Sequence, residues 1–176
     1  MVDKSYLLTD QQMRFFVVNG YIILKPDLPA SYHGSIFEKT EAVFEKEGNP
    51  GDNLLPRIPE IGEVFDSKII QGGLMSLLGE DYCMQPHRHA HNNPPGSSGQ
   101  KLHQDSTEKD RSHLPRRLLA FYYPQDTTEE MGPTEVLPGS HFILGQSALV
   151  THYGSIRGTK KCVGPVGTVF LTCYPI

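Results

Sequence analysis

The sequence changes character after Gly79, and this change limits the folds that the chain can adopt. Before it, apolar residues recur at helical spacing; after it, short strand-like runs alternate with turn clusters such as NNPPGSSGQ, TTEEMGPT and VLPGSH. A chain of 176 residues with 38% hydrophobic residues can bury one ordinary core and little more. We therefore predict a single domain over 1–176, with a helical support region over 1–79 and a β-rich region over 80–176.

The helical region opens with a clear start signal. The hydroxyl of Thr9 can cap a helix, and Gln12 three residues later completes a capping box. Gly20 should end this helix, and the apolar, β-branched run YIIL at 21–24 predicts a short strand.

Two further helical segments follow in the sequence. Apolar residues at helical spacing predict a helix over 33–47, with Gly48 ending it. A third helical region is predicted over 59–79, and the adjacent Gly72 and Gly73 should break it into two pieces.

The β-rich region contains two strong strand candidates and one weak one. RLLAFYYP at 117–124 and GTVFLTCY at 167–174 are rich in strand-forming residues. YCMQPHRHAHNN at 82–93 is weaker, because Pro86 confines a strand to an edge or a bulge. Short strands separated by turns are typical of a β-sandwich or barrel.

Composition narrows the classes of function. The net charge is −4 without a long basic block, which argues against nucleic acid as a partner. There is no run of 18 apolar residues and no secretory signal pattern at the start, so we expect a cytoplasmic protein that does not bind membranes. The three cysteines form no C-x-x-C pair, so we predict buried or semi-buried thiols rather than disulfides or a zinc site. The classes of function that remain are small-molecule chemistry and binding to protein partners.

Histidines gather in one part of the sequence. In the stretch HRHAH, His87, His89 and His91 would share one face of an extended strand. Such a face is either a metal or anion site, or a polar surface turned toward water or a cleft. The pattern alone favours the polar surface, because no carboxylate or cysteine stands between the histidines.

The stretch KLHQDS carries the sharper signal. His103 and Asp105 stand two positions apart, so in extended chain an imidazole and a carboxylate converge on one side. With one more histidine they would form the facial set of donors that suits iron(II). By itself, the His-x-Asp pattern is weak, and a surface turn in which Asp105 caps the following segment is the favoured interpretation.

Several stretches in order resemble the phytanoyl-CoA dioxygenase family of iron(II)- and 2-oxoglutarate-dependent oxygenases. LTDQQMRFFVVNGYIIL resembles the family's first helix and strand, and HQD resembles its first two metal ligands. FYYPQDTTEEMGPTEVLPGSHF resembles the next strand, an acidic turn and the segment that ends in P-G-S-H. The resemblance implies a mainly β fold with flanking helices (α+β), built on a double-stranded β-helix of the jelly-roll or cupin-like kind.

The resemblance also implies residue roles and cofactors. His103 and Asp105 match the iron ligands, and Gln104 lies beside the 2-oxoglutarate co-substrate. Phe121 falls on the strand beside 2-oxoglutarate, and His89 and Arg57 match weaker co-substrate contacts. Iron(II), 2-oxoglutarate and O2 would then carry the hydroxylation of a small organic substrate. For His141, inside P-G-S-H, a turn-stabilising role is favoured over a ligand role.

The sequence departs from the family pattern at the third metal ligand. After GTVFLTCYPI the family continues with a distal histidine and then an arginine that clamps 2-oxoglutarate, whereas this sequence stops at Ile176. We therefore expect an incomplete chain whose jelly roll lacks its last strands. Alone, it is expected to bind iron poorly and not to turn over 2-oxoglutarate.

Two other functions stay open at this stage. One is a non-catalytic jelly-roll binding or regulatory relative that keeps HQD without the rest of the site. The other is a cupin-type metal-binding protein that uses the HRHAH stretch with His103. The sequence does not determine the substrate or the oligomeric state, and a peroxisomal location stays open if a further C-terminal segment carries a targeting signal.

Overall fold

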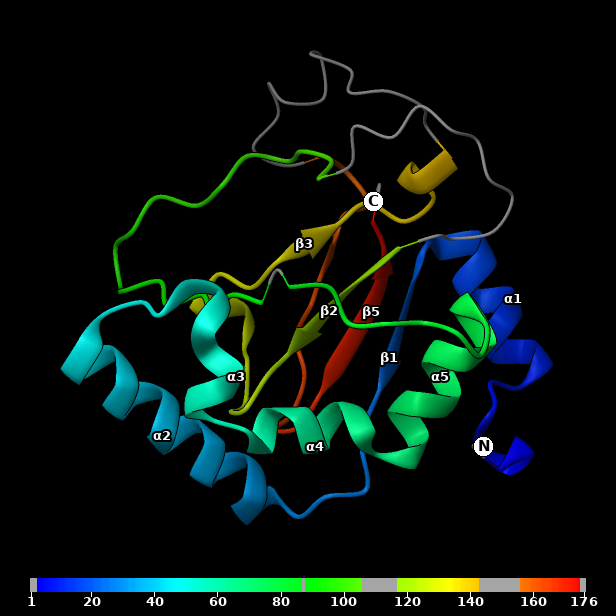
Figure 1. Ribbon diagram of the computed structural model, residues 1–176. Coiled ribbons are helices and arrows are strands. Elements are labelled where there is room, and N and C mark those ends of the chain that lie inside the picture. Colours follow the sequence, from blue (N-terminus) through cyan, green and yellow to red (C-terminus); the bar gives the residue numbers. More distant parts are fainter. Residues whose placement is uncertain (1–2, 87, 106–116, 143–155, 175–176) are drawn as a thin grey trace.

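The computed structural model describes residues 3–86, 88–105, 117–142 and 156–174 (Figure 1). Its centre is a three-stranded antiparallel sheet in the order β1 (Tyr21–Leu24), β5 (Val169–Cys173), β2 (Leu118–Tyr122). A second sheet pairs β3 (Glu135–Val136) with β4 (Lys160–Lys161). The first and last described strands of the chain are therefore neighbours, with Tyr21 opposite Thr172.

Helices occupy most of the first half of the chain, as the sequence predicts. The α-helices are α1 (Asp10–Asn19), α2 (Ala30–Glu47), α3 (Leu54–Arg57), α4 (Glu60–Asp66) and α5 (Lys68–Leu78). Short 3-10 turns are η1 (Lys4–Tyr6), η2 (Gly51–Asn53), η3 (Glu129–Met131) and η4 (Ser140–Phe142). Within the described part, no helix is long and apolar enough to cross a membrane.

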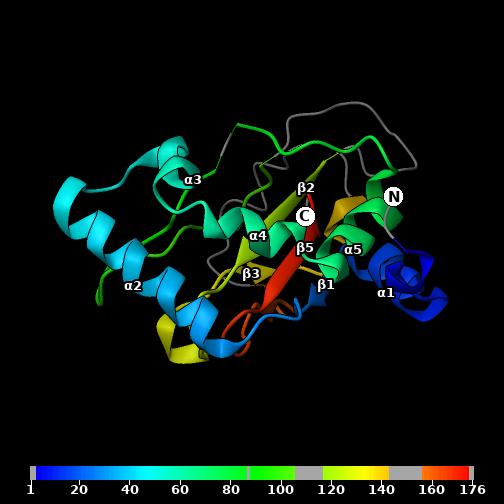
Figure 2. The ribbon, with the colours of Figure 1, turned by 60° about the horizontal axis from the view of Figure 1, so that its bottom comes forward.

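The two faces of the central sheet pack against different layers. Along β5, Val169 and Leu171 join the apolar cluster formed with the helices, which includes Val64 and Ile70. Phe170, between them, points to the opposite face and packs with Val136 of β3 and with Cys162, which directly follows β4. Figure 2 shows α4 and α5 lying across the sheet. The sheet is thus the middle layer, and β5 is buried along its whole length.

The predicted start and end of the first helix are confirmed. The Thr9 main-chain N–H donates to Oε1 of Gln12 over 2.9 Å, and the Gln12 N–H donates back to the Thr9 hydroxyl over 3.3 Å. Gly20 follows the helix with φ 80°, a left-handed conformation that favours glycine. The strand at 21–24 is confirmed with the predicted bounds.

Two helix predictions need correction. The second helix begins at Ala30, directly after Pro29, rather than at 33. The third region breaks at Ser67, whose extended ψ of 141° separates α4 from α5, so the predicted break at Gly72 and Gly73 is wrong. Both glycines are buried inside α5, where a Cβ would lie 2.0 Å from the Tyr6 carbonyl oxygen or 2.5 Å from Leu24 Cδ1. They permit close packing rather than a break.

The strand predictions are confirmed in two of three cases. β2 and β5 lie inside the predicted ranges 117–124 and 167–174. The strand predicted at 82–93 is wrong, because the residues described there have no regular secondary structure and most are exposed. Pro86 lacks an N–H to donate, and exposed residues without a pairing strand gain nothing from an extended ladder.

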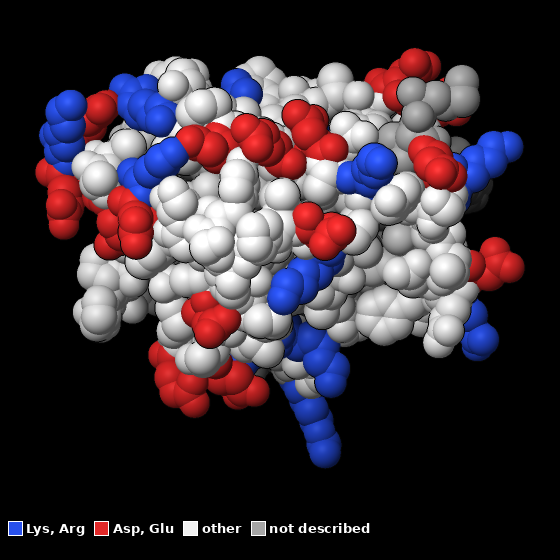
Figure 3. Space-filling view, turned by 90° about the horizontal axis from the view of Figure 1, so that it is seen from below, with Lys and Arg blue, Asp and Glu red and all other residues white. Residues whose placement is uncertain are grey.

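These elements define a mixed α+β fold with antiparallel sheets, which confirms the predicted class. Within the described residues, helices contribute more of the chain than strands, so "mainly β" overstated the strand content. Cys162 and Cys173 are buried, as expected, but Cys83 is exposed. Acidic and basic side chains are intermixed on the face seen in Figure 3.

Candidate metal centre

The two predicted metal ligands face each other. Nε2 of His103 lies 3.2 Å from Oδ1 of Asp105, and both side chains are 44% exposed. They belong to a segment without regular secondary structure, so the convergence comes from the two-residue spacing in extended chain. The pair is open to solvent on one side and therefore accessible to an ion.

The hydrogen bond of Nδ1 of His103 determines whether Nε2 can act as a metal ligand. Nδ1 of His103 lies 2.7 Å from the main-chain carbonyl oxygen of Lys101. A carbonyl oxygen only accepts, so the hydrogen must be on Nδ1, and neutral imidazole then carries a lone pair on Nε2. That lone pair faces a carboxylate oxygen, an arrangement that needs a proton or a metal cation between the two atoms. A ligand histidine typically holds its other N–H on a carbonyl in this way.

Gln104 links the donor pair to the P-G-S-H segment. Its side-chain amide donates to the main-chain carbonyl of Ser140 over 3.4 Å. Ser140 opens η4 and is buried. The HQD and P-G-S-H stretches, which are far apart in the sequence, are therefore in contact in the fold.

The P-G-S-H segment in turn lies on the end of α1. The Gly139 N–H donates to the Asn19 carbonyl over 3.1 Å, and Nε2 of His141 bonds to the Val17 carbonyl over 3.0 Å. Burial lowers the pKa of His141, while the bond to Val17 opposes that shift. Sequence reasoning assigned His141 to the turn alone; its contact with α1 depends on tertiary structure, which the motif does not encode.

Phe121 lies on the sheet face that points away from the helices. It is directly opposite Phe170 in the β2–β5 ladder and is partly buried against the second-sheet cluster. Thr172 is on the same face and fully buried, and its hydroxyl has no hydrogen-bond partner among the described residues. This face thus combines an aromatic ring with a buried hydroxyl that has no hydrogen-bond partner among the described residues.

His89 and Arg57 lie beside the helical region. Nε2 of His89 is 3.1 Å from Oδ1 of Asp52 in η2, and the His89 ring is 6.3 Å from that of His91. The Arg57 guanidinium donates to Glu47 at the end of α2 over 2.7 Å and to the Asn53 carbonyl over 3.0 Å. Their proposed contacts with a co-substrate stay predictions.

The HRHAH alternative is tested only in part. His87 lies outside the described residues. Among the residues that are described, no group of three or more His, Cys, Asp or Glu side chains is arranged to hold a metal ion. The pair formed by His103 and Asp105 supplies two donors, fewer than such a group contains.

The fold is an α+β fold with an antiparallel sheet, and its candidate metal centre is the facing imidazole and carboxylate of His103 and Asp105. Residues 19–150 match the sequence profile of the phytanoyl-CoA dioxygenase family. The chain therefore belongs to this family. No curated protein matches the chain.

Proposed function

We propose that this protein is an iron(II)- and 2-oxoglutarate-dependent oxygenase that hydroxylates a small organic molecule, with His103 and Asp105 as two of its iron ligands. The observation that carries the proposal is the 3.2 Å approach of Nε2 of His103 to Oδ1 of Asp105, with Nδ1 held on a carbonyl. Family membership supports the same chemistry. The fold proposed with this function is the jelly roll that the family implies.

The residues present fit such a centre. One imidazole nitrogen and one carboxylate oxygen are donors that iron(II) accepts, and the pair is open enough to leave room for other ligands. When bound, iron(II) with 2-oxoglutarate and O2 supplies the oxidising chemistry. The protein's own residues bind the ion, orient the co-substrate and exclude water from it.

Two side chains are proposed to orient the co-substrate. Gln104 lies between the donors in sequence, and Phe121 presents a partly buried ring on the sheet face that points away from the helices. Thr172 adds a buried hydroxyl on that face, and we propose that a carboxylate oxygen is its missing partner. An aromatic wall with one polar anchor would favour a small dicarboxylate over bulk water.

Metal binding with and without co-substrate tests this proposal. Because 2-oxoglutarate chelates through its keto acid, adding it should raise the affinity for Mn²⁺, an EPR-visible substitute for iron(II). Glutarate, which has both carboxylates but no keto group, is the matched control and should not raise it. Equal affinity with both compounds would contradict the oxygenase and favour a non-catalytic metal-binding relative.

A further inference from the structure

We propose that His141 is a positioning residue for the metal pair: by bonding η4 to the end of α1, it sets where Gln104, and with it His103 and Asp105, are held. This inference rests on the proposed function, because it concerns the same donor pair. It assigns a role to a side chain that lies outside the pair and makes no contact with the ion.

The main-chain carbonyls at the end of α1 need hydrogen-bond partners. The last four carbonyls of a helix have no partner within it. In α1, the Phe16 carbonyl accepts from the Gly20 N–H, and the Asn19 carbonyl accepts from Gly139. His141 takes the Val17 carbonyl. The P-G-S-H segment therefore caps α1 through two bonds, one from main chain and one from the His141 ring.

The imidazole ring of His141 is closely packed against the residues around it. A Cβ built on Gly20 would lie 2.4 Å from Nδ1 of His141, so the imidazole rests directly on the glycine backbone. Nδ1 is buried and has no partner among the described residues, and the ring lies 4.0 Å from that of Phe142. The ring is thus held by packing as well as by its bond to Val17.

A hydrogen bond joins η4 to the segment that carries His103 and Asp105. Ser140 directly precedes His141, and its carbonyl accepts from the Gln104 side chain. Gln104 is the residue between His103 and Asp105, so a shift of its backbone moves both donors. A metal site loses affinity when such supporting contacts are lost, because the donors no longer start in the binding geometry.

His141→Ala and His141→Gln test this assignment. Alanine removes both the donor and the ring, whereas glutamine keeps an N–H that can reach the Val17 carbonyl. We expect His141→Ala to weaken Mn²⁺ binding roughly tenfold or more and His141→Gln to restore part of the affinity. In the metal-free protein, the NMR signals of the His103 ring should shift in His141→Ala and return toward wild type in His141→Gln.

His33→Gln is the matched control for a general loss of stability. His33 is also buried, but its Nδ1 bonds to the Tyr122 hydroxyl over 2.7 Å at the opposite end of the sheet. We expect it to lower the melting temperature without changing Mn²⁺ affinity or the His103 signals. A folded His141→Ala protein with wild-type affinity and unshifted His103 signals would overturn the inference while leaving the proposed function intact. Equal Mn²⁺ affinity in wild type and Asp105→Asn would overturn both.

Discussion

The side chain of Gln104 donates to the main-chain carbonyl of Ser140 over 3.4 Å, joining positions 36 residues apart. This contact connects the donor segment, which has no regular secondary structure, to η4, which is fixed on α1. The donor segment is largely exposed, and the contact with η4 restricts the conformations that it samples. The contact therefore supports the segment that carries His103 and Asp105.

Gln104→Ala tests that support directly. The bond is long and partly exposed, so its loss should change the free energy of unfolding by less than about 1 kcal/mol. The affinity for Mn²⁺ should nevertheless fall several-fold, roughly toward tenfold, because both donors lose their common anchor. Calorimetric titration alongside urea unfolding separates the two effects. Unchanged affinity in a folded variant would contradict the anchoring role.

Adjacent glycines in α5 make a second, internally controlled comparison. A Cβ on Gly72 would strike the Tyr6 main-chain carbonyl, whereas one on Gly73 would meet the end of the flexible Leu24 side chain. Gly72→Ala should therefore destabilise the protein by about 2–3 kcal/mol. Gly73→Ala should cost clearly less, because the Leu24 side chain can move and alanine favours the helix. Urea unfolding checks this order, and equal losses would contradict it.

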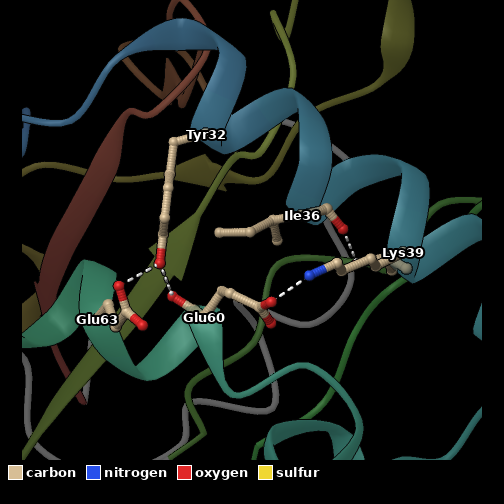
Figure 4. A network of polar contacts seen from close by, with 6 residues as sticks. Tyr32, Ile36, Lys39, Glu60 and Glu63 are labelled. Atoms are coloured by element: carbon tan, nitrogen blue, oxygen red, sulfur yellow. Dashed lines mark hydrogen bonds and ion pairs between the residues drawn. The ribbon is translucent and has the colours of Figure 1, made fainter.

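Tyr32 connects α2 to α4 (Figure 4). Its hydroxyl donates to a Glu63 carboxylate oxygen over 2.6 Å and lies 3.4 Å from the Glu60 carbonyl. Burial, with Glu63 beside it, raises the pKa of Tyr32 to about 12, so the hydroxyl keeps its proton at neutral pH. Tyr32→Phe should cost about 1 kcal/mol of unfolding free energy and leave Mn²⁺ affinity unchanged. A neutral effect on stability would show that the bond contributes nothing.

Buried His33 predicts a pH dependence of stability. Burial lowers the pKa of His33 below its ordinary value of 6.5, so at mildly acidic pH the unfolded chain binds the proton more readily than the folded one. Stability should therefore be full above pH 6.5 and decrease as the pH falls below it. His33→Gln should reduce this slope in urea unfolding at a series of pH values. His141 shifts in the same direction, so part of the slope should remain.

The sequence predicts those elements whose signals are local. Thr9 with Gln12 starts α1, Gly20 ends it, and the apolar run of β5 is strong enough to locate a buried strand. The break in the third helical region was misplaced because a glycine pair resembles a helix breaker. Only the packing of Tyr6 and Leu24 on those glycines reveals their use.

In the candidate site, too, the sequence predicts the local features but not the tertiary contacts. The spacing of His103 and Asp105 predicts that they converge, since two residues in extended chain share a face. The support from Ser140 and His141 comes from segments far away in sequence, and single-sequence patterns do not report such contacts. The position of His89 beside Asp52 follows from tertiary structure for the same reason.

The most direct test of the central claim is the Mn²⁺ affinity of wild type and Asp105→Asn, measured from the free-ion EPR signal. The substitution keeps the side-chain size but removes the charge that faces Nε2 of His103. Glu129→Gln, which removes a charge at the Lys161 ion pair, is the control. We predict at least a roughly tenfold loss for Asp105→Asn and none for Glu129→Gln. Equal affinity in wild type and Asp105→Asn would contradict the assignment of this pair as the metal centre.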